Sequence, residues 1–195
     1  MSRTAPTHLV QPFSPLRLRE RTLGVQIGAV LFGTALMTAS SYVSVPMVPV
    51  PMTMQTLAAT LIGALYGWRL GALTIAVWLL QGALGMPVFS NGGGGLVHLL
   101  GPTSGYLFGF VVAAALCGAL AERGWTGDRI GWSFLSMLAG TALITLMGWA
   151  WLANLVGVEK AFWVGVAPFM LGGIVKSALG AAILKAMQAT VRRAA

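Results

Sequence analysis

The stretch Leu84–Tyr106, LGMPVFSNGGGGLVHLLGPTSGY, decides how the chain is divided. It lies between two apolar runs and contains Pro87, Asn91, His98 and the four consecutive glycines Gly92–Gly95. Glycine and proline weaken a helix through lost rigidity or lost hydrogen bonds, so a membrane helix cannot continue through this stretch. Irregular backbone at membrane depth is tolerated only where it is buried in protein or lines a cavity. We therefore expect this segment, the glycine loop, to border a ligand site.

The composition is that of a membrane protein. Of the 195 residues, 57% are hydrophobic and 8% are charged, whereas an average soluble domain has roughly 25% charged residues. The net charge of +8 does not indicate binding of nucleic acid, because the basic residues flank apolar runs and form no amphipathic surface. Cys117 is the only cysteine, so disulfides and thiolate metal sites are excluded within one chain.

The apolar runs predict an all-α membrane protein with six transmembrane helices in one bundle. We expect a cytoplasmic N-terminal tail over residues 1–21 and a single membrane domain over residues 22–195. The predicted helices cover about residues 22–43, 54–66, 72–84, 105–121, 132–155 and 162–190. Short turns are expected at Gly67–Gly71 and Gly157–Lys160, and Pro168 is expected to kink the last helix.

Two irregular segments are expected on the outer side of the membrane. One is the glycine loop, and the other is SVPMVPVPMT at Ser44–Thr53, the proline loop, in which three prolines prevent a helix. An even number of spans places both termini on one side, together with the turns that carry most of the arginines. The arginines of that side include Arg17, Arg19, Arg21, Arg69, Arg123, Arg129, Arg192 and Arg193. Because cytoplasmic loops are enriched in Lys and Arg, we expect both termini in the cytoplasm and both irregular loops outside.

The sequence lacks the residue groups that a membrane enzyme needs. All four acidic residues, Glu20, Glu122, Asp128 and Glu159, fall in predicted flanks or turns. A hydrolase would need an acid/base pair, a metal cluster or an activated nucleophile, and His98 has no partner nearby in sequence and is interpreted as structural or interfacial. There is also no GxxxxGK[ST] motif for ATP hydrolysis. We therefore expect no catalytic residue, no metal and no cofactor.

Lys176 is the exception among the charged residues. It lies in GGIVKSALGAA, inside the last predicted helix and far from both ends. A lysine at bilayer depth is costly and indicates a functional site, while snorkelling of its side chain to the interface is the alternative. No carboxylate lies in a predicted helix, so we expect its partner to be an anionic ligand, held by a charge-assisted hydrogen bond.

Four further side chains are candidates for contact with such a ligand. Asn91 and Gln55 can donate and accept at once, which suits an amide or urea group. The alternatives are turn formation beside glycines for Asn91 and helix capping for Gln55. Tyr106 and Trp78 could supply apolar walls with a polar tip, or serve only in packing or at the membrane interface. Together these residues predict a modest pocket for a small, partly apolar carboxylic acid.

Small residues recur at a spacing of four in the first predicted helix. The pairs are Ala29 with Gly33 and Ala35 with Ala39. Small side chains let two helices approach closely in lipid. The pattern therefore indicates either packing within this bundle or a docking face for another membrane protein.

Three features of the sequence resemble the BioY family, the biotin-specific substrate-binding (S) components of energy-coupling factor transporters. They are VPVPMTMQT at Val48–Thr56, GMPVF…GG…LLGPTSGYLFGF at Gly85–Phe110, and the late Lys176. The resemblance implies a six-helix fold in a bacterial plasma (inner) membrane and high-affinity binding of biotin from the outer face. It also implies partnership with a transmembrane coupling protein and two cytosolic ATPases, with the small residues of the first helix as the docking face. The alternative is a solitary, low-affinity transporter or facilitator for biotin or a related small carboxylate.

The resemblance carries over to the site residues only in part. Asn91 lies in the family's glycine loop, where polar groups contact biotin, and Lys176 matches the family's ligand lysine. In typical members an aspartate stands three residues before that lysine, and here the position is Gly173. The departure implies that the ureido ring is bound differently, that the affinity for biotin is lower, or that the specificity is shifted toward a biotin precursor or analogue. It also makes Lys176 more dependent on the ligand anion.

Overall fold

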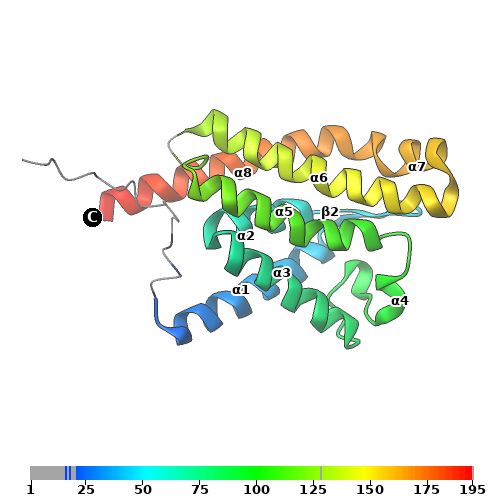
Figure 1. Ribbon diagram of the computed structural model, residues 1–195, viewed down its shortest axis with the longest axis horizontal. Coiled ribbons are helices and arrows are strands. Elements are labelled where there is room, and N and C mark those ends of the chain that lie inside the picture. The colour runs from blue at the N-terminus through cyan, green and yellow to red at the C-terminus, as the bar shows by residue number, and fades with distance from the viewer. Residues whose placement is uncertain (1–15, 17, 19–20, 128, 195) are drawn as a thin grey trace, which may run out of the picture.

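The computed structural model describes residues 16, 18, 21–127 and 129–194, and it is dominated by helices (Figure 1). The helices are α1 Leu23–Tyr42, α2 Gln55–Tyr66, α3 Trp68–Ala83, α4 Leu96–Leu99, α5 Ser104–Glu122, α6 Ile130–Val156, α7 Val158–Gly165 and α8 Ala167–Ala194. Strands β1 Ser44–Val45 and β2 Met52–Thr53 and a 3₁₀ turn, η2 Ser90–Gly92, complete the elements. The predicted all-α class is confirmed. The predicted tail over residues 1–21 lies almost wholly outside the described residues.

Helix α5 is the centre of the bundle and packs against α2, α3 and α6, while α8 packs on α6. The helices approach closely where glycines face a neighbouring backbone. A Cβ at Gly63 in α2 would collide with the backbone of Ala114, and one at Gly118 in α5 would collide with the backbone of Trp68. Close approach at small residues is how helices pack in lipid, where apolar side chains gain little by leaving the bilayer.

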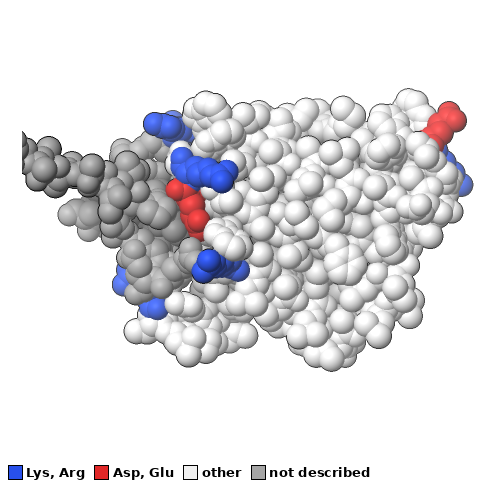
Figure 2. All heavy atoms as spheres, viewed as in Figure 1, with Lys and Arg blue, Asp and Glu red and all other residues white. Residues whose placement is uncertain are grey.

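The two ends of the elongated bundle differ. Helix α1 begins and α8 ends at one end, and α4 lies at the other (Figure 1). Lys and Arg side chains gather at the end that holds the C-terminus, and the visible face between the two ends carries no charged side chain (Figure 2). In the described part of the chain, four helical segments are long and apolar enough to cross a membrane. They are Leu23–Tyr42, Ser104–Glu122, Ile130–Val156 and Val158–Thr190.

The start of α3 corrects the predicted turn at Gly67–Gly71. Gly67 alone makes the turn, with φ 78°, and α3 begins at the next residue, four residues before the predicted start. Positive φ is easy for glycine and costly for other residues. The backbone N–H of Trp68 donates to Oε1 of Glu122, at 3.3 Å, so a side chain from α5 supplies an acceptor for the start of α3. Arg69 consequently lies in the first turn of a helix.

The last predicted helix, about residues 162–190, is two helices, and the break between them lies close to the predicted kink at Pro168. The predicted helix is divided at Val166, where φ −122° and ψ −58° interrupt it, into α7 and α8. Pro168 explains the break, because proline lacks an N–H and its ring clashes with a helical carbonyl four residues earlier. Pro168 is therefore accommodated in the first turn of α8, which is where helices tolerate proline. The predicted turn at Gly157–Lys160 shrinks to Gly157 itself, with φ 88°.

The two irregular loops are ordered segments. In the proline loop, β1 and β2 pair antiparallel, with Ser44 opposite Thr53; the absence of a helix there was predicted, and the strand pair was not. The glycine loop holds η2, α4 and the first turn of α5. Its backbone is tied to the bundle by Tyr42, whose hydroxyl donates to the carbonyl of Pro87 at 2.7 Å, and by Trp151, whose Nε1 donates to the carbonyl of Gly101 at 3.0 Å.

Candidate substrate-binding site

A cavity lies where the proline loop and the glycine loop meet the bundle. Its lining comes from both loops, from the start of α2, and from the inner faces of α5, α6 and α8. The three faces bring the polar groups of the loops against aromatic and aliphatic side chains of the helices. The cavity lining includes His98 of α4, and α4 lies at the end of the bundle opposite the one where Lys and Arg gather (Figures 1 and 2). Of the five residues predicted to contact a ligand, Lys176, Gln55 and Tyr106 line it.

Lys176 is half-buried in the wall of the cavity. Its Nζ donates to the backbone carbonyl of Thr53 at 2.6 Å, which joins α8 to strand β2. An ammonium carries three hydrogens, so this bond leaves donors for a further acceptor in the cavity. No Asp or Glu lies among the described residues that line the cavity. The positive charge is therefore balanced by no carboxylate of the wall, and the site favours an anion.

Gln55 presents a buried donor to the same cavity. The side chain is 4% exposed, and its Oε1 accepts from the hydroxyl of Thr53 at 3.0 Å. Its Nε2 has no hydrogen-bond partner in the described part of the chain. The backbone N–H of Gln55 donates to the same hydroxyl, at 3.3 Å, and the N-cap position of α2 is Met54, so the side chain of Gln55 does not cap the helix. A buried donor without a partner costs about 1–3 kcal/mol, which a ligand acceptor can recover.

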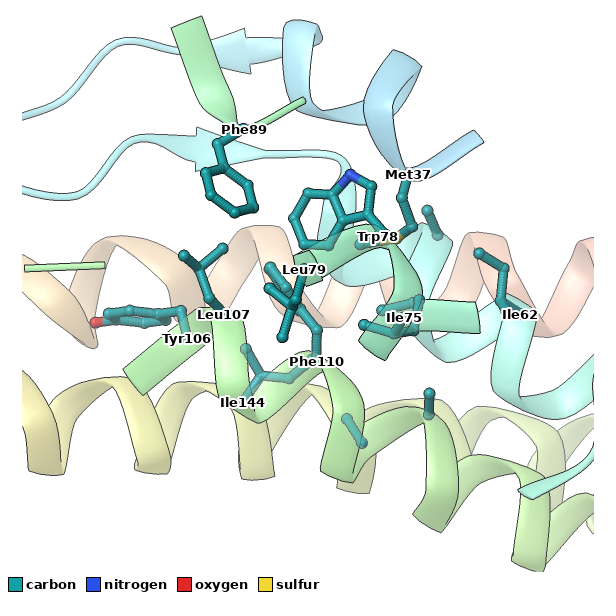
Figure 3. Packing of buried hydrophobic residues seen from close by; sticks show 14 of the residues in the cluster. Met37, Ile62, Ile75, Trp78, Leu79, Phe89, Tyr106, Leu107, Phe110 and Ile144 are labelled. Atoms are coloured by element: carbon teal, nitrogen blue, oxygen red, sulfur yellow. The ribbon is translucent and has the colours of Figure 1, made fainter. Parts of the chain in front are cut away.

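Tyr106 and Trp78 both lie on the apolar side of the site. Tyr106 is in the cavity wall, and Trp78 is behind that wall. Tyr106 lines the cavity with its ring, while its hydroxyl donates to the carbonyl of Gly165 at 2.7 Å. Trp78 is fully buried and does not line the cavity. It lies behind the wall, edge-on to Phe89 with ring centroids 5.1 Å apart and to Phe110 with 6.3 Å (Figure 3). Trp78 thus supports two aromatic residues that do line the cavity.

Asn91 lies at the surface of the glycine loop and outside the cavity lining. Its backbone has φ 58° and ψ 28° inside the 3₁₀ turn Ser90–Gly92. Asparagine tolerates this left-handed region better than other residues with a side chain. The geometry fits the turn-forming alternative, and the neighbouring Ser90 faces the cavity in its place.

His98 and two threonines were missed as candidates. His98 lines the cavity mouth, and its Nδ1 contacts the carbonyl of Gly94 at 2.8 Å. A carbonyl only accepts, so Nδ1 is assigned the hydrogen, and in the neutral ring Nε2 is an acceptor. Thr141 and Thr145 line the cavity from α6. Their spacing of four on an apolar helix is a polar stripe, a signal that could have found them.

The small residues of α1 divide into two faces. Ala29 and Gly33 pack inward: the hydroxyl of Tyr66 donates to the carbonyl of Ala29 at 2.9 Å, and a Cβ at Gly33 would meet Thr74. Ala35 and Ala39 are exposed. One pair therefore serves packing within the bundle, and the other leaves a small-residue surface open.

Comparison with known proteins relates the chain to one family. A sequence model of the BioY family matches residues 15–193. The probable biotin transporter BioY of Pyrococcus horikoshii is 39% identical over 163 residues, which cover 84% of this chain and 96% of the relative. The biotin transporter BioY of Thermotoga maritima is 38% identical over 151 residues, covering 77% and 88%. A crystal structure of the S-component for biotin from an ECF-type ABC transporter shares the fold, with a TM-score of 0.77 at 21% identity over 86% of this chain and 94% of that chain.

Proposed function

The chain belongs to the BioY family, and from this premise we propose that it is the biotin-binding S component of an energy-coupling factor transporter. In this role it binds biotin with high affinity from the outer face of a bacterial plasma membrane. It is not an enzyme, and ATP is hydrolysed by two cytosolic ATPases that act through a transmembrane coupling protein. The observation that carries the proposal is the half-buried Lys176 in a cavity whose described lining holds no carboxylate.

The chemistry of the cavity fits the groups of biotin. The ammonium of Lys176 pairs with the ligand carboxylate, for which the wall offers no competing anion. Nε2 of Gln55 is a donor for the ureido carbonyl, and Nε2 of His98 is an acceptor for a ureido N–H. Tyr106 and Phe110 supply aromatic surface for the apolar rings and chain. The reverse orientation, with the ureido carbonyl at Lys176, is the alternative.

The proposed topology has one membrane domain and six crossings, made by α1, α2, α3, α5, α6 and the pair α7–α8. At 1.5 Å per residue, α2 and α3 are about 18 and 24 Å long, which is short for a hydrocarbon core of ~30 Å. Gly67 joins the two helices directly, and α2 begins at the buried Gln55, so the irregular loops complete these two crossings. Both termini are cytoplasmic, which the basic end of the bundle supports (Figure 2).

The proposed docking face for the coupling protein is the exposed side of α1. It combines Ala35 and Ala39 with Gly24 and Gly28, which share that side of the helix. A Cβ on either glycine would meet no other described atom within 4 Å. Such a surface admits a partner helix at close range. Ala29 and Gly33 contribute indirectly, because they fix α1 against the bundle.

Uptake of labelled biotin tests this proposal in cells that lack their own biotin transport. We expect uptake when the chain is expressed with a coupling protein and two ATPases, and little without them. Ala35→Trp with Ala39→Trp should abolish uptake and leave biotin binding intact, whereas Ala182→Trp, at an exposed position of α8, is the matched control. Equal uptake without the ATPases would favour the solitary facilitator, and absence of biotin binding would overturn both.

A further inference from the structure

Thr53 connects the proline loop to two helices of the site. It ends strand β2, pairs with Ser44 of β1 and lines the cavity, and it is 8% exposed. Its backbone carbonyl accepts from Nζ of Lys176 in α8 at 2.6 Å. Its hydroxyl contacts two atoms of Gln55 at the start of α2. Thr53 thus holds two of the polar side chains that the proposed function assigns to the ligand.

The two contacts with Gln55 decide which way its side-chain amide points. A backbone N–H only donates, so the N–H of Gln55 makes the Thr53 oxygen an acceptor, at 3.3 Å. The hydroxyl hydrogen of Thr53 then needs an acceptor of its own, and Oε1 of Gln55 supplies it at 3.0 Å. If the amide were turned over, both this hydrogen and Oε1 would lose their bond. The hydrogen-bond network therefore assigns Oε1, and not Nε2, to Thr53.

The same orientation leaves the donor end of the amide for a ligand. Nε2 of Gln55 is buried and has no hydrogen-bond partner in the described part of the chain, and the residue lines the cavity. An NH₂ group in this position pairs with a ligand acceptor, whereas a ligand N–H would set two donors against each other. A site built to hydrogen-bond one group of its ligand rejects an analogue that lacks the group, because the buried protein atom stays unpaired.

We propose that Thr53 is a positioning residue that sets the specificity of Gln55: its hydroxyl holds Oε1 and thereby aims the NH₂ group at a carbonyl of the ligand. The inference rests on the proposed function, since it takes the ureido carbonyl of biotin to meet Nε2. Without the hydroxyl the amide is free to turn over. Gln55 then offers the ligand either an acceptor or a donor, and the protein no longer distinguishes a carbonyl from an N–H at that place.

The test is calorimetric titration of unmodified and Thr53→Val protein with biotin and with 2-iminobiotin. At neutral pH 2-iminobiotin is protonated and carries N–H donors where biotin has its ureido carbonyl. We expect the unmodified protein to prefer biotin at least about tenfold. Valine suits a strand and keeps the backbone carbonyl that accepts from Lys176. Thr53→Val should bind biotin about 2- to 13-fold more weakly, the worth of one neutral hydrogen bond, and its preference for biotin should fall at least about threefold.

Two control variants separate positioning of the amide from a general loss of structure. Thr53→Ser keeps the hydroxyl and should keep both the affinity for biotin and the preference within about twofold. Thr60→Val removes another buried hydroxyl, which is in α2, donates to backbone carbonyls and lies outside the cavity lining. It should change neither quantity. A loss in Thr53→Ser as large as that in Thr53→Val would overturn the inference.

A double-mutant cycle tests the link between Thr53 and Gln55 directly. Gln55→Leu leaves no amide to orient, so adding Thr53→Val to it should change the affinity for biotin by less than about twofold. Equal losses from Thr53→Val with and without Gln55 would overturn the inference, and so would an unchanged preference over 2-iminobiotin. Thr53→Ala removes the same hydroxyl and replaces Thr53→Val if that variant does not fold. If the unmodified protein bound no biotin, the proposed function would fail and the inference with it; if it bound biotin and the variants kept its preference, only the inference would fail.

Discussion

Replacement of Lys176 by methionine tests which end of biotin meets the charge. Methionine keeps the unbranched chain up to the ε position and removes the ammonium, which donates to the carbonyl of Thr53 at 2.6 Å. Loss of that bond affects the free and the bound protein alike and largely cancels in the dissociation constant. Loss of a bond to the ligand does not cancel. A hydrogen bond to a charged group contributes about 1.5–3 kcal/mol, so biotin should bind about 10- to 150-fold more weakly to Lys176→Met.

The assay is isothermal titration calorimetry of purified protein with biotin and with its uncharged N-methyl amide. If Lys176 faces the carboxylate, the unmodified protein should prefer biotin, and Lys176→Met should lose most of that preference. We expect a coupling of about tenfold between residue and ligand, because a charge-assisted hydrogen bond is roughly twice as strong as a neutral one. Lys185→Met, an exposed lysine of the same helix outside the cavity, is the control. Equal losses for both ligands would refute the carboxylate assignment and favour the ureido carbonyl as the group at Lys176.

Three further substitutions test the site and its support. Gln55→Leu removes the unpartnered Nε2 donor and should weaken biotin binding about 2- to 13-fold in the same titration; an unchanged affinity would exclude Gln55 from the contact. Gly82→Ala places a Cβ against the ring of Phe89. Such overpacking costs about 1–3 kcal/mol and should lower the midpoint of thermal unfolding by about 2–12 °C. An unchanged midpoint would contradict the close packing of Phe89 on Gly82. Asn91→Gly should preserve the affinity within about twofold, because glycine adopts the same backbone freely; a loss above about tenfold would show that Asn91 binds the ligand after all.

That Lys176 and Gln55 line a cavity could be predicted from the sequence. A polar side chain in or beside an apolar run is costly to bury unless it has a polar partner. The cost of burying such groups depends little on the details of the fold. Most helix limits followed from apolar runs in the same way. The division between α7 and α8 did not, because the stretch stays apolar on both sides of Val166 and only the place of Pro168 decides where the helix stops.

The direction of loop side chains could not be predicted. Asn91 and His98 both lie in the glycine loop, and Asn91 was the stronger candidate by its chemistry. The structure places His98 in the cavity lining and Asn91 outside it. Asn91 lies in the 3₁₀ turn Ser90–Gly92 and His98 in the short helix α4, and neither element follows from the run of glycines. The faces of α1 posed a similar difficulty: a spacing of four shows that Gly33 and Ala35 belong to small-residue pairs, and only the neighbouring helices decide which pair faces inward.

The central claim is that the cavity between the two loops binds biotin, and native mass spectrometry of the purified protein tests it most directly. Protein isolated from cells grown with biotin should carry one bound molecule with the mass of biotin, and Lys176→Met protein prepared alongside should have lost it. A bound molecule of another mass, or an empty protein that also takes up no added biotin, would contradict the account.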